Sequence, residues 1–338
     1  MEFLNGERGP YGRQPKPAER RGVDSTGSAY QGETYYGRPV LKPSHYGQLI
    51  ASYLFIGGIA GASQIIATLA DWTGDRRNRF ITRAGRYLSL GGILAAPLFL
   101  IADLRTPERW YNMLRIFRRT SPMSIGSWTL TAFGGLSGIT ALLQFLADRR
   151  RRPVYRRAAR AFALPATGAG AIVATYTGTL LGSTSTPLWA RASRFLPALF
   201  GISAAATSTA ALTLAAHASG ASRITARRLE RLAAMIAGIE FLASAALDRH
   251  WERGHLAAPL KQPPTAIAYR GGYKTLGIAV PLLVHGLSVA TRRRSRRASM
   301  CAAAATLIGG YLLRSVIVHA GRDSARRPED YFQVTEAD

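Results

Sequence analysis

Long apolar stretches separated by short, strongly basic segments form the main pattern of the chain. A membrane-spanning helix needs about 20 mainly apolar residues, and eight stretches of this kind are present. They cover residues 46–70, 86–104, 126–147, 160–183, 193–216, 226–248, 270–290 and 299–319. Ala, Gly, Ser and Thr are abundant in all of them, and such small residues let helices pack closely within lipid. The pattern predicts an all-α protein, an integral membrane bundle of eight transmembrane helices.

The two ends of the chain differ from these stretches. Residues 1–45 are rich in Gly, Pro, Tyr and charge, contain no apolar run of signal-peptide length, and have a composition that favours little structure of its own. We therefore expect an extramembrane N-terminal tail over 1–45, an eight-helix membrane domain over 46–319, and an extramembrane C-terminal tail over 320–338.

The charge of the chain is high, with 44 Lys and Arg against 19 Asp and Glu and a formal net charge of +25. On a soluble protein this charge would suggest a nucleic-acid partner. Here the arginines form short clusters between apolar stretches, as at 149–152 and 292–294. Such clusters are typical of the cytoplasmic loops of membrane proteins, so we expect contact with membrane lipid and none with nucleic acid.

The distribution of basic residues predicts an orientation. The loops 71–85, 148–160, 217–228 and 291–298 contain 19 Lys and Arg in 48 residues, whereas 104–125, 184–192 and 249–269 contain nine in 52. By the positive-inside rule the first set faces the cytoplasm. We therefore expect a multi-pass protein of the cell inner (cytoplasmic) membrane with both termini on the outer side, although seven basic residues in the N-terminal tail act against this orientation.

The chemistry that one chain of this composition can perform is restricted. Cys301 is the only cysteine, whereas an iron–sulfur cluster typically needs about four thiolates. If the protein performs redox chemistry, we therefore expect its iron–sulfur clusters to lie on a partner chain. Walker-type, HExxH and GxSxG motifs, which would indicate soluble-enzyme chemistry, are absent from the sequence.

Polar side chains inside the apolar stretches are functional candidates, because burying them in a bilayer is costly. With a rise of 1.5 Å per residue, Tyr53 and Tyr176 lie about 10 Å from the outer ends of their helices. Glu240 lies about 12 Å deep and Arg314 about 7–8 Å deep, and Asp103 closes the outer end of the second helix. We expect these five residues to converge in the outer half of the bundle.

Structural roles are the alternatives for most of these residues. Arg314 could extend to the interface, Asp103 could cap its helix, and the tyrosines could belong to an interfacial aromatic belt. Glu240 lies well inside its span, where a carboxyl group should be neutral or paired. We interpret it as a proton-transfer residue or as the partner of Arg314 in an ion pair.

Two histidines lie in the inner half of the predicted bundle. His217 and His285 at matching depth could ligate a haem, but His217 lies at the very end of its span, and we predict no haem. His285 is instead a candidate for proton transfer from the cytoplasm, or else a residue that packs at a helix interface.

Four short stretches carry a resemblance to a known family. They are Tyr36–Pro39 ahead of Tyr53–Gly61, Asp103–Trp110, Thr120–Trp128, and Tyr176–Leu181 followed by Pro187–Trp189. In this order and within eight apolar stretches they resemble the NrfD/PsrC family, the membrane anchors of polysulfide reductase-type and related molybdopterin oxidoreductases. The matched stretches lie within residues 36–189, and the second half is similar in helix count and polarity only.

The resemblance implies a function. Such an anchor binds a quinone or quinol near the outer face and exchanges electrons with a four-cluster, ferredoxin-like iron–sulfur subunit, which connects to a catalytic subunit, often a molybdopterin enzyme. By this resemblance Tyr176 lines the quinone pocket, Tyr53 is nearest to a polar residue of the first helix that hydrogen-bonds the quinone, and Asp103 corresponds to an acidic residue near the site.

We therefore interpret the chain as the quinone- or quinol-reactive membrane anchor of a respiratory oxidoreductase complex, using menaquinone or ubiquinone. A secondary transporter or proton-translocating protein is the alternative, in which Glu240, Arg314 and His285 would form a path for a substrate or protons. We find no clear internal repeat of the kind that transporters tend to show. A structural anchor without quinone chemistry is a third possibility.

Overall fold

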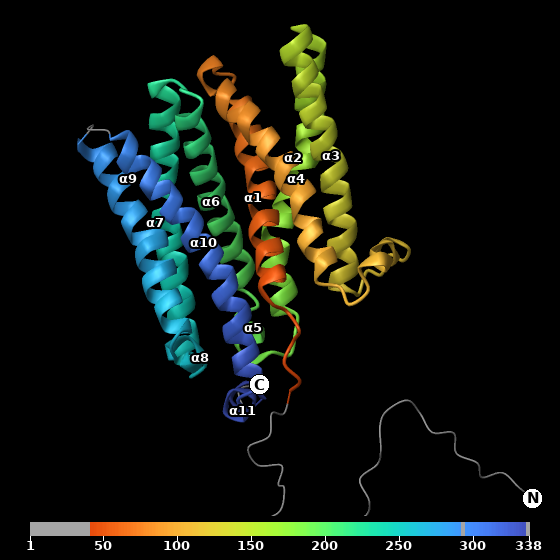
Figure 1. Ribbon diagram of the computed structural model, residues 1–338, viewed down its shortest axis with the longest axis vertical. Helices are drawn as coiled ribbons and strands as arrows, with labels where there is room; N and C mark the ends of the chain where they lie inside the picture. The colour runs from red at the N-terminus through yellow and green to blue at the C-terminus, as the bar shows by residue number, and fades with distance from the viewer. Residues whose placement is uncertain (1–40, 292–294, 336–338) are drawn as a thin grey trace, which may run out of the picture. The chain divides into compact units, whose positions relative to one another are not determined.

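Helices form all the regular secondary structure in the part of the chain that the computed structural model describes, residues 41–291 and 295–335 (Figure 1). The long helices are α1 (Gln48–Trp72), α2 (Arg79–Ala102), α3 (Pro122–Arg150), α4 (Pro153–Gly182), α6 (Leu196–Ala218), α7 (Arg223–Arg253) and α10 (Arg296–Ala325). A π-helix, η3 (Ile267–Ala279), continues directly into α9 (Val280–Thr291). The all-α prediction is confirmed for these residues.

Short helices connect the long ones. They are η1 (Arg76–Asn78), η2 (Pro107–Leu114), α5 (Pro187–Arg191), α8 (Ala258–Lys261) and α11 (Pro328–Thr335). Local sequence accounts for several helix starts, because the hydroxyls of Ser121, Ser222 and Ser295 accept hydrogen bonds from backbone N–H groups of the first turns of α3, α7 and α10. Proline stands at the start of α3, α4 and α5, where its missing N–H costs nothing.

The long helices form two packed groups. Helices α1 to α4 contact one another in one group, and α6, α7, η3–α9 and α10 do so in the other. Contacts of α6 with α1 and α4, and of α10 with α1, join the groups. Successive long helices run in opposite directions in Figure 1, so α1 and α4 begin at opposite ends of the bundle.

Glycine permits two of the closest helix contacts. A Cβ at Gly61 of α1 would stand less than 3.0 Å from the backbone of Gly170 in α4. A Cβ at Gly277 of η3 would lie 2.6 Å from the Cα of Gly309 in α10. Small residues thus bring these backbones together, as expected of helices packed in lipid.

Six helices are long and apolar enough to cross a membrane: α1, α2 extended to Arg76, α3, α6, η3–α9 and α10. Large apolar side chains such as Leu98, Leu142, Leu242 and Leu283 are exposed on the sides of the helices. An aqueous surface would penalise this exposure, whereas lipid does not. The chain is an integral membrane protein.

Helices α4 and α7 do not meet the same criterion. They have 30 and 31 residues and pack within the two groups, but their sequences are more polar. Arg156, Arg157 and Arg160 lie in the first turns of α4, and α7 has charged residues at both ends. Composition alone therefore does not establish the predicted number of eight spans.

The segments beyond the predicted membrane domain are partly described. Helix α10 continues past residue 319 to Ala325, and α11 follows and contacts α5 and α10. Most of the predicted N-terminal tail, the stretch Tyr36–Pro39 and the arginine cluster 292–294 lie outside the described residues.

Candidate functional site

Three of the predicted site residues lie at the end of the bundle where α1 begins. Tyr53 is in the first half of α1 and buried, Asp103 directly follows α2, and Tyr176 lies in the last two turns of α4. The phenol of Tyr176 is close enough to those of Tyr53 and Tyr46 to interact electrostatically with both, and Tyr46 interacts in the same way with Asp103. The fold thus gathers three phenols and a carboxyl group from three helix ends, and we call these four residues the tyrosine cluster.

The position of Tyr176 depends on a glycine in the neighbouring helix. The Tyr176 hydroxyl donates a hydrogen bond to the backbone carbonyl of Pro122 at the start of α3. Its ring lies directly on the backbone of Gly126, where any Cβ would come closer than 3.0 Å. The Tyr53 hydroxyl, by contrast, has no hydrogen-bond partner among the described residues. Tyr53 is therefore a buried residue whose hydroxyl donor the fold itself does not use.

The outer edge of the tyrosine cluster contains groups that can exchange protons. Partial burial raises the pKa of Asp103, and His45 at 4.0 Å between Nε2 and Oδ2 acts in the opposite direction. Burial, and then the charge of Asp103, raise the pKa of Tyr46. The ring of Tyr46 stacks on Trp189 with centroids 6.1 Å apart. Sequence reasoning missed Tyr46, although an aromatic residue beside His45 at the entrance of the first helix was an available signal.

Glu240 and Arg314 belong to a separate buried group between α6, α7, η3 and α10. The guanidinium of Arg314 is fully enclosed, with 1% of the residue exposed, so it does not extend to the interface. It donates to the Ser203 hydroxyl at 2.7 Å, to the Gly310 carbonyl at 2.9 Å and to the Phe200 carbonyl at 3.1 Å.

Glu240 faces this guanidinium without touching it. The two side chains interact electrostatically, but they form no ion pair within 4.0 Å in the described structure. Tyr273 of η3 also interacts with Glu240. The phenols of Tyr269 and Tyr273 lie together, with ring centroids 5.7 Å apart, on a π-helix, a conformation that is often found at functional sites. Sequence reasoning did not single out Ser203 or Tyr273.

The five residues expected to converge are therefore distributed over two groups. Tyr53, Asp103 and Tyr176 belong to the tyrosine cluster, and Glu240 and Arg314 to the second group. Helix α1 lies between them, because Gly58 approaches Arg314, with a Cβ that would be 3.5 Å from Nη2, and Tyr53 is five residues earlier. At about 100° per residue, the two positions are on different faces of α1.

His285 lies near the opposite end of the bundle, in the last turns of α9. It is buried, and its Nδ1 atom has no hydrogen-bond partner in residues 41–291 and 295–335. His285 interacts electrostatically with Glu230 and His217, and Ser288 donates to Glu230 at 3.1 Å. Within the described residues, no group of three or more His, Cys, Asp or Glu is arranged to bind a metal ion.

Comparison with known sequences identifies a protein family. The family described as polysulphide reductase, NrfD, matches residues 41–323, a range that contains both groups and all the long helices except the last two residues of α10. No curated protein matches the chain.

Proposed function

The chain belongs to the NrfD family of polysulphide reductase-type membrane anchors of oxidoreductases, and from this premise we propose that it is the quinone- or quinol-reactive anchor of a respiratory complex. In this proposal all eight long helical segments cross the membrane, α4 and α7 included, and both termini are on the outer side of the cell inner membrane. The observation that carries the proposal is the tyrosine cluster, in which the hydroxyl of the buried residue Tyr53 has no hydrogen-bond partner among the described residues.

The residues of the tyrosine cluster suit a quinone head group, which presents two carbonyl oxygens and exchanges two electrons and two protons. Tyr53 donates a hydrogen bond to one carbonyl. Tyr176 donates to the other after its hydroxyl turns away from the Pro122 carbonyl. Asp103 and His45 transfer protons between the head group and the outer aqueous phase, because they lie together at the edge of the cluster, 4.0 Å apart between Nε2 and Oδ2.

The electrons come from, or go to, a partner chain. Only one cysteine, Cys301, is present, too few for a cluster. We place a four-cluster, ferredoxin-like iron–sulfur subunit on the outer side, against η2, where Trp110 and Tyr111 are exposed and aromatic side chains are typical of interface cores. That subunit connects to a molybdopterin or similar catalytic subunit. The quinone is menaquinone or ubiquinone, and the anchor itself binds neither metal nor haem.

Substitution of the two phenols tests this function. In the assembled complex, Tyr53→Phe and Tyr176→Phe should each lower turnover with a short-chain quinol by about tenfold, the effect of losing about 1.4 kcal/mol of hydrogen bonding. Tyr155→Phe is the matched control, because Tyr155 is at the opposite end of α4 and its hydroxyl accepts a hydrogen bond from Arg150. Native turnover and native quinol affinity in both variants would exclude the site.

Proton translocation is the second candidate function, and the burial of Glu240 and Arg314 in one enclosed group favours it. Intramembrane charges of this kind commonly belong to proton or substrate paths. In this alternative Glu240 transfers protons in the outer half, His285 does so in the inner half, and Arg314 balances the charge of Glu240. A purified chain in liposomes containing a pH-sensitive dye distinguishes the two functions, because a transporter works alone, whereas an anchor shows activity only with its iron–sulfur partner.

A further inference from the structure

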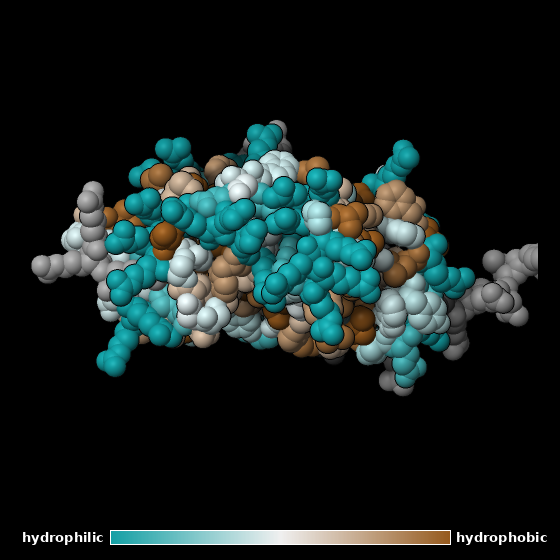
Figure 2. Space-filling view, turned by 90° about the horizontal axis from the view of Figure 1, so that it is seen from above, coloured by the Kyte–Doolittle hydropathy of each residue, from teal (hydrophilic) through white to brown (hydrophobic). Residues whose placement is uncertain are grey.

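A cavity of about 870 Å³ lies at the end of the bundle remote from the tyrosine cluster. Its walls are the end of α1, η1, the start of α2, and the turn between α3 and α4. Seven arginines and three aspartates line it. The space-filling view onto this end shows the hydrophilic side chains gathered there, with apolar surface among and around them (Figure 2).

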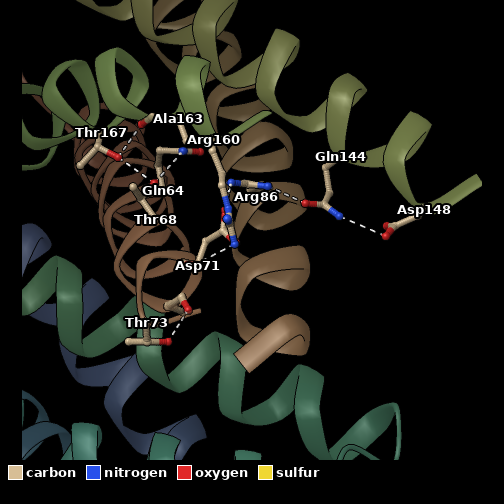
Figure 3. A network of polar contacts seen from close by, with 11 residues as sticks. Gln64, Thr68, Asp71, Thr73, Arg86, Gln144, Asp148, Arg160, Ala163 and Thr167 are labelled. Atoms are coloured by element: carbon tan, nitrogen blue, oxygen red, sulfur yellow. Dashed lines mark hydrogen bonds and ion pairs between the residues drawn. The ribbon is translucent and has the colours of Figure 1, made fainter. Parts of the chain in front are cut away.

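The aspartates of the cavity are already neutralised. Asp71 binds Arg86 and Arg160, each at 3.0 Å, and the Arg86 side chain is only 1% exposed. Gln144 accepts from Arg86 at 2.5 Å and donates to Asp148 at 3.1 Å, so one continuous polar network joins α1, α2, α3 and α4 (Figure 3).

The other two carboxylates are paired in the same way. Asp148 also binds Arg83 at 3.0 Å, and Asp75 binds Arg228 of α7 at 2.5 Å. The carboxylates of the cavity therefore leave no negative charge to balance further arginines.

Five lining arginines have no ion pair in the part of the chain that the structure describes. They are Arg76, Arg79, Arg151, Arg152 and Arg156. Like charges around one cavity repel each other, and the repulsion is relieved when an anion binds among them.

The backbone of Arg151 supports a built site. Arg151 ends α3 in the left-handed region, with φ 53°, where a non-glycine residue is disfavoured by about 1–2 kcal/mol. The conformation makes the sharp turn into α4 that brings Arg151, Arg152 and Arg156 to the cavity. Local strain that serves to position charged side chains is common at functional sites.

The cavity lies where the apolar surface of the bundle ends. Leu142 and Phe145 of α3 are exposed just before the arginine cluster, and Phe80 of α2 lines the cavity itself. A ligand with phosphate groups and acyl chains would contact both surfaces, and basic pockets between membrane helices bind such head groups.

We propose that this cavity binds the phosphate groups of an anionic ligand. The adjoining apolar surface favours a phospholipid with two phosphates over a soluble polyphosphate. The bound phosphates offset part of the positive charge of the five arginines and connect the α1–α2 pair to the α3–α4 pair. This inference is independent of the quinone chemistry, because the cavity is at the opposite end of the helices.

The test uses the delipidated complex and three probes: nanodiscs containing cardiolipin, nanodiscs of phosphatidylcholine alone, and inorganic pyrophosphate. Binding is measured as lipid phosphorus retained per protein and as the shift of the thermal unfolding midpoint. The double variant Arg151→Gln/Arg156→Gln removes two cavity charges. Arg149→Gln/Arg157→Gln is the matched control, because it removes the same charge from exposed positions of the same turn that do not line the cavity.

The cavity variant should bind cardiolipin roughly 30-fold more weakly than the wild type, at about 1 kcal/mol for each arginine, and the control should bind like the wild type. Binding of cardiolipin that pyrophosphate does not displace assigns the ligand to lipid. Direct, saturable binding of pyrophosphate, weakened in the same variant, assigns it to a soluble phosphate. Equal losses in the two double variants, or equal retention of cardiolipin and phosphatidylcholine, would overturn the proposal.

Discussion

Replacing Gly126 with alanine tests the geometry of the tyrosine cluster directly. The added Cβ would stand less than 3.0 Å from the ring of Tyr176, whereas carbon atoms in ordinary contact are about 3.5–4.0 Å apart. The ring must therefore withdraw by at least about 0.5 Å. Because the backbone of α3 is held by its neighbours, the movement falls on Tyr176 and on its hydrogen bond to the Pro122 carbonyl.

Three contributions determine the change in the free energy of unfolding. Overpacking a well-filled site costs about 1–3 kcal/mol, and the lost hydrogen bond about 1 kcal/mol more. Alanine in place of glycine within a helix stabilises the folded state by about 1 kcal/mol, because alanine has the higher helix propensity. The net expectation for Gly126→Ala is a destabilisation of about 1–3 kcal/mol, or a thermal midpoint lower by roughly 2–10 °C.

Gly135 provides the matched control within the same helix. Nothing lies within 4 Å of a Cβ built there, so Gly135→Ala should keep or slightly raise the midpoint. Thermal unfolding of the purified complex and turnover with a short-chain quinol would be measured for both variants. Gly126→Ala should lower turnover about as much as Tyr176→Phe does, roughly tenfold, and Gly135→Ala should leave it unchanged.

Two results would contradict the proposed packing and role of Tyr176. A midpoint for Gly126→Ala equal to or above that of Gly135→Ala would contradict the close contact between α3 and Tyr176. A lowered midpoint with full quinol turnover would keep the contact but remove Tyr176 from the site. The first result concerns the fold, and the second concerns the function.

Two further predictions concern the buried side chains Glu240 and Arg314, and Asp75 at the arginine-lined cavity. Glu240→Gln and Arg314→Gln should have non-additive effects on stability, with a coupling of more than about 0.5 kcal/mol, because the two groups share one enclosed environment; additive losses in the double variant would contradict this coupling. The backbone N–H of Arg77 and then the side chain of Arg228 lower the pKa of Asp75 from its ordinary 3.8. Asp75 therefore stabilises the fold above pH 3.8 and loses this effect as the pH falls through its lowered pKa, so the midpoint difference between wild type and Asp75→Asn should be present at pH 7 and should vanish in acid.

Much of the architecture could be predicted from the sequence, because a helix that crosses a membrane requires a stretch of a certain length and apolar composition. All eight predicted stretches overlap a long helical segment, and their ends differ by up to seven residues. Capping serines and prolines set several of the starts, as at Ser121 and Ser222. Six of these segments meet the composition of a membrane span by themselves. In α4 and α7 the charged residues at the helix ends lower the mean hydropathy.

The candidate sites depended more on tertiary structure. Depth along a helix placed Tyr53, Tyr176 and Asp103 at one end, because rise per residue is a local property. The depth of a residue does not determine how its helix is rotated about its axis. This rotation separates Glu240 and Arg314 from the tyrosines, on the other side of α1. The path of the chain before α1 brings Tyr46 into the same cluster as Tyr176.

The arginine-lined cavity separates most clearly what the sequence predicts from what the tertiary structure adds. The sequence by itself determined that arginines gather between the apolar stretches, since the charge of each loop follows from its amino-acid composition. Only the tertiary structure decided which of them find a carboxylate. Arg86 is enclosed beside Asp71, whereas Arg151 and Arg156 face a cavity. The physical reason is that pairing requires atoms to meet within about 4 Å, and the crossing of helices far apart in the chain sets these distances.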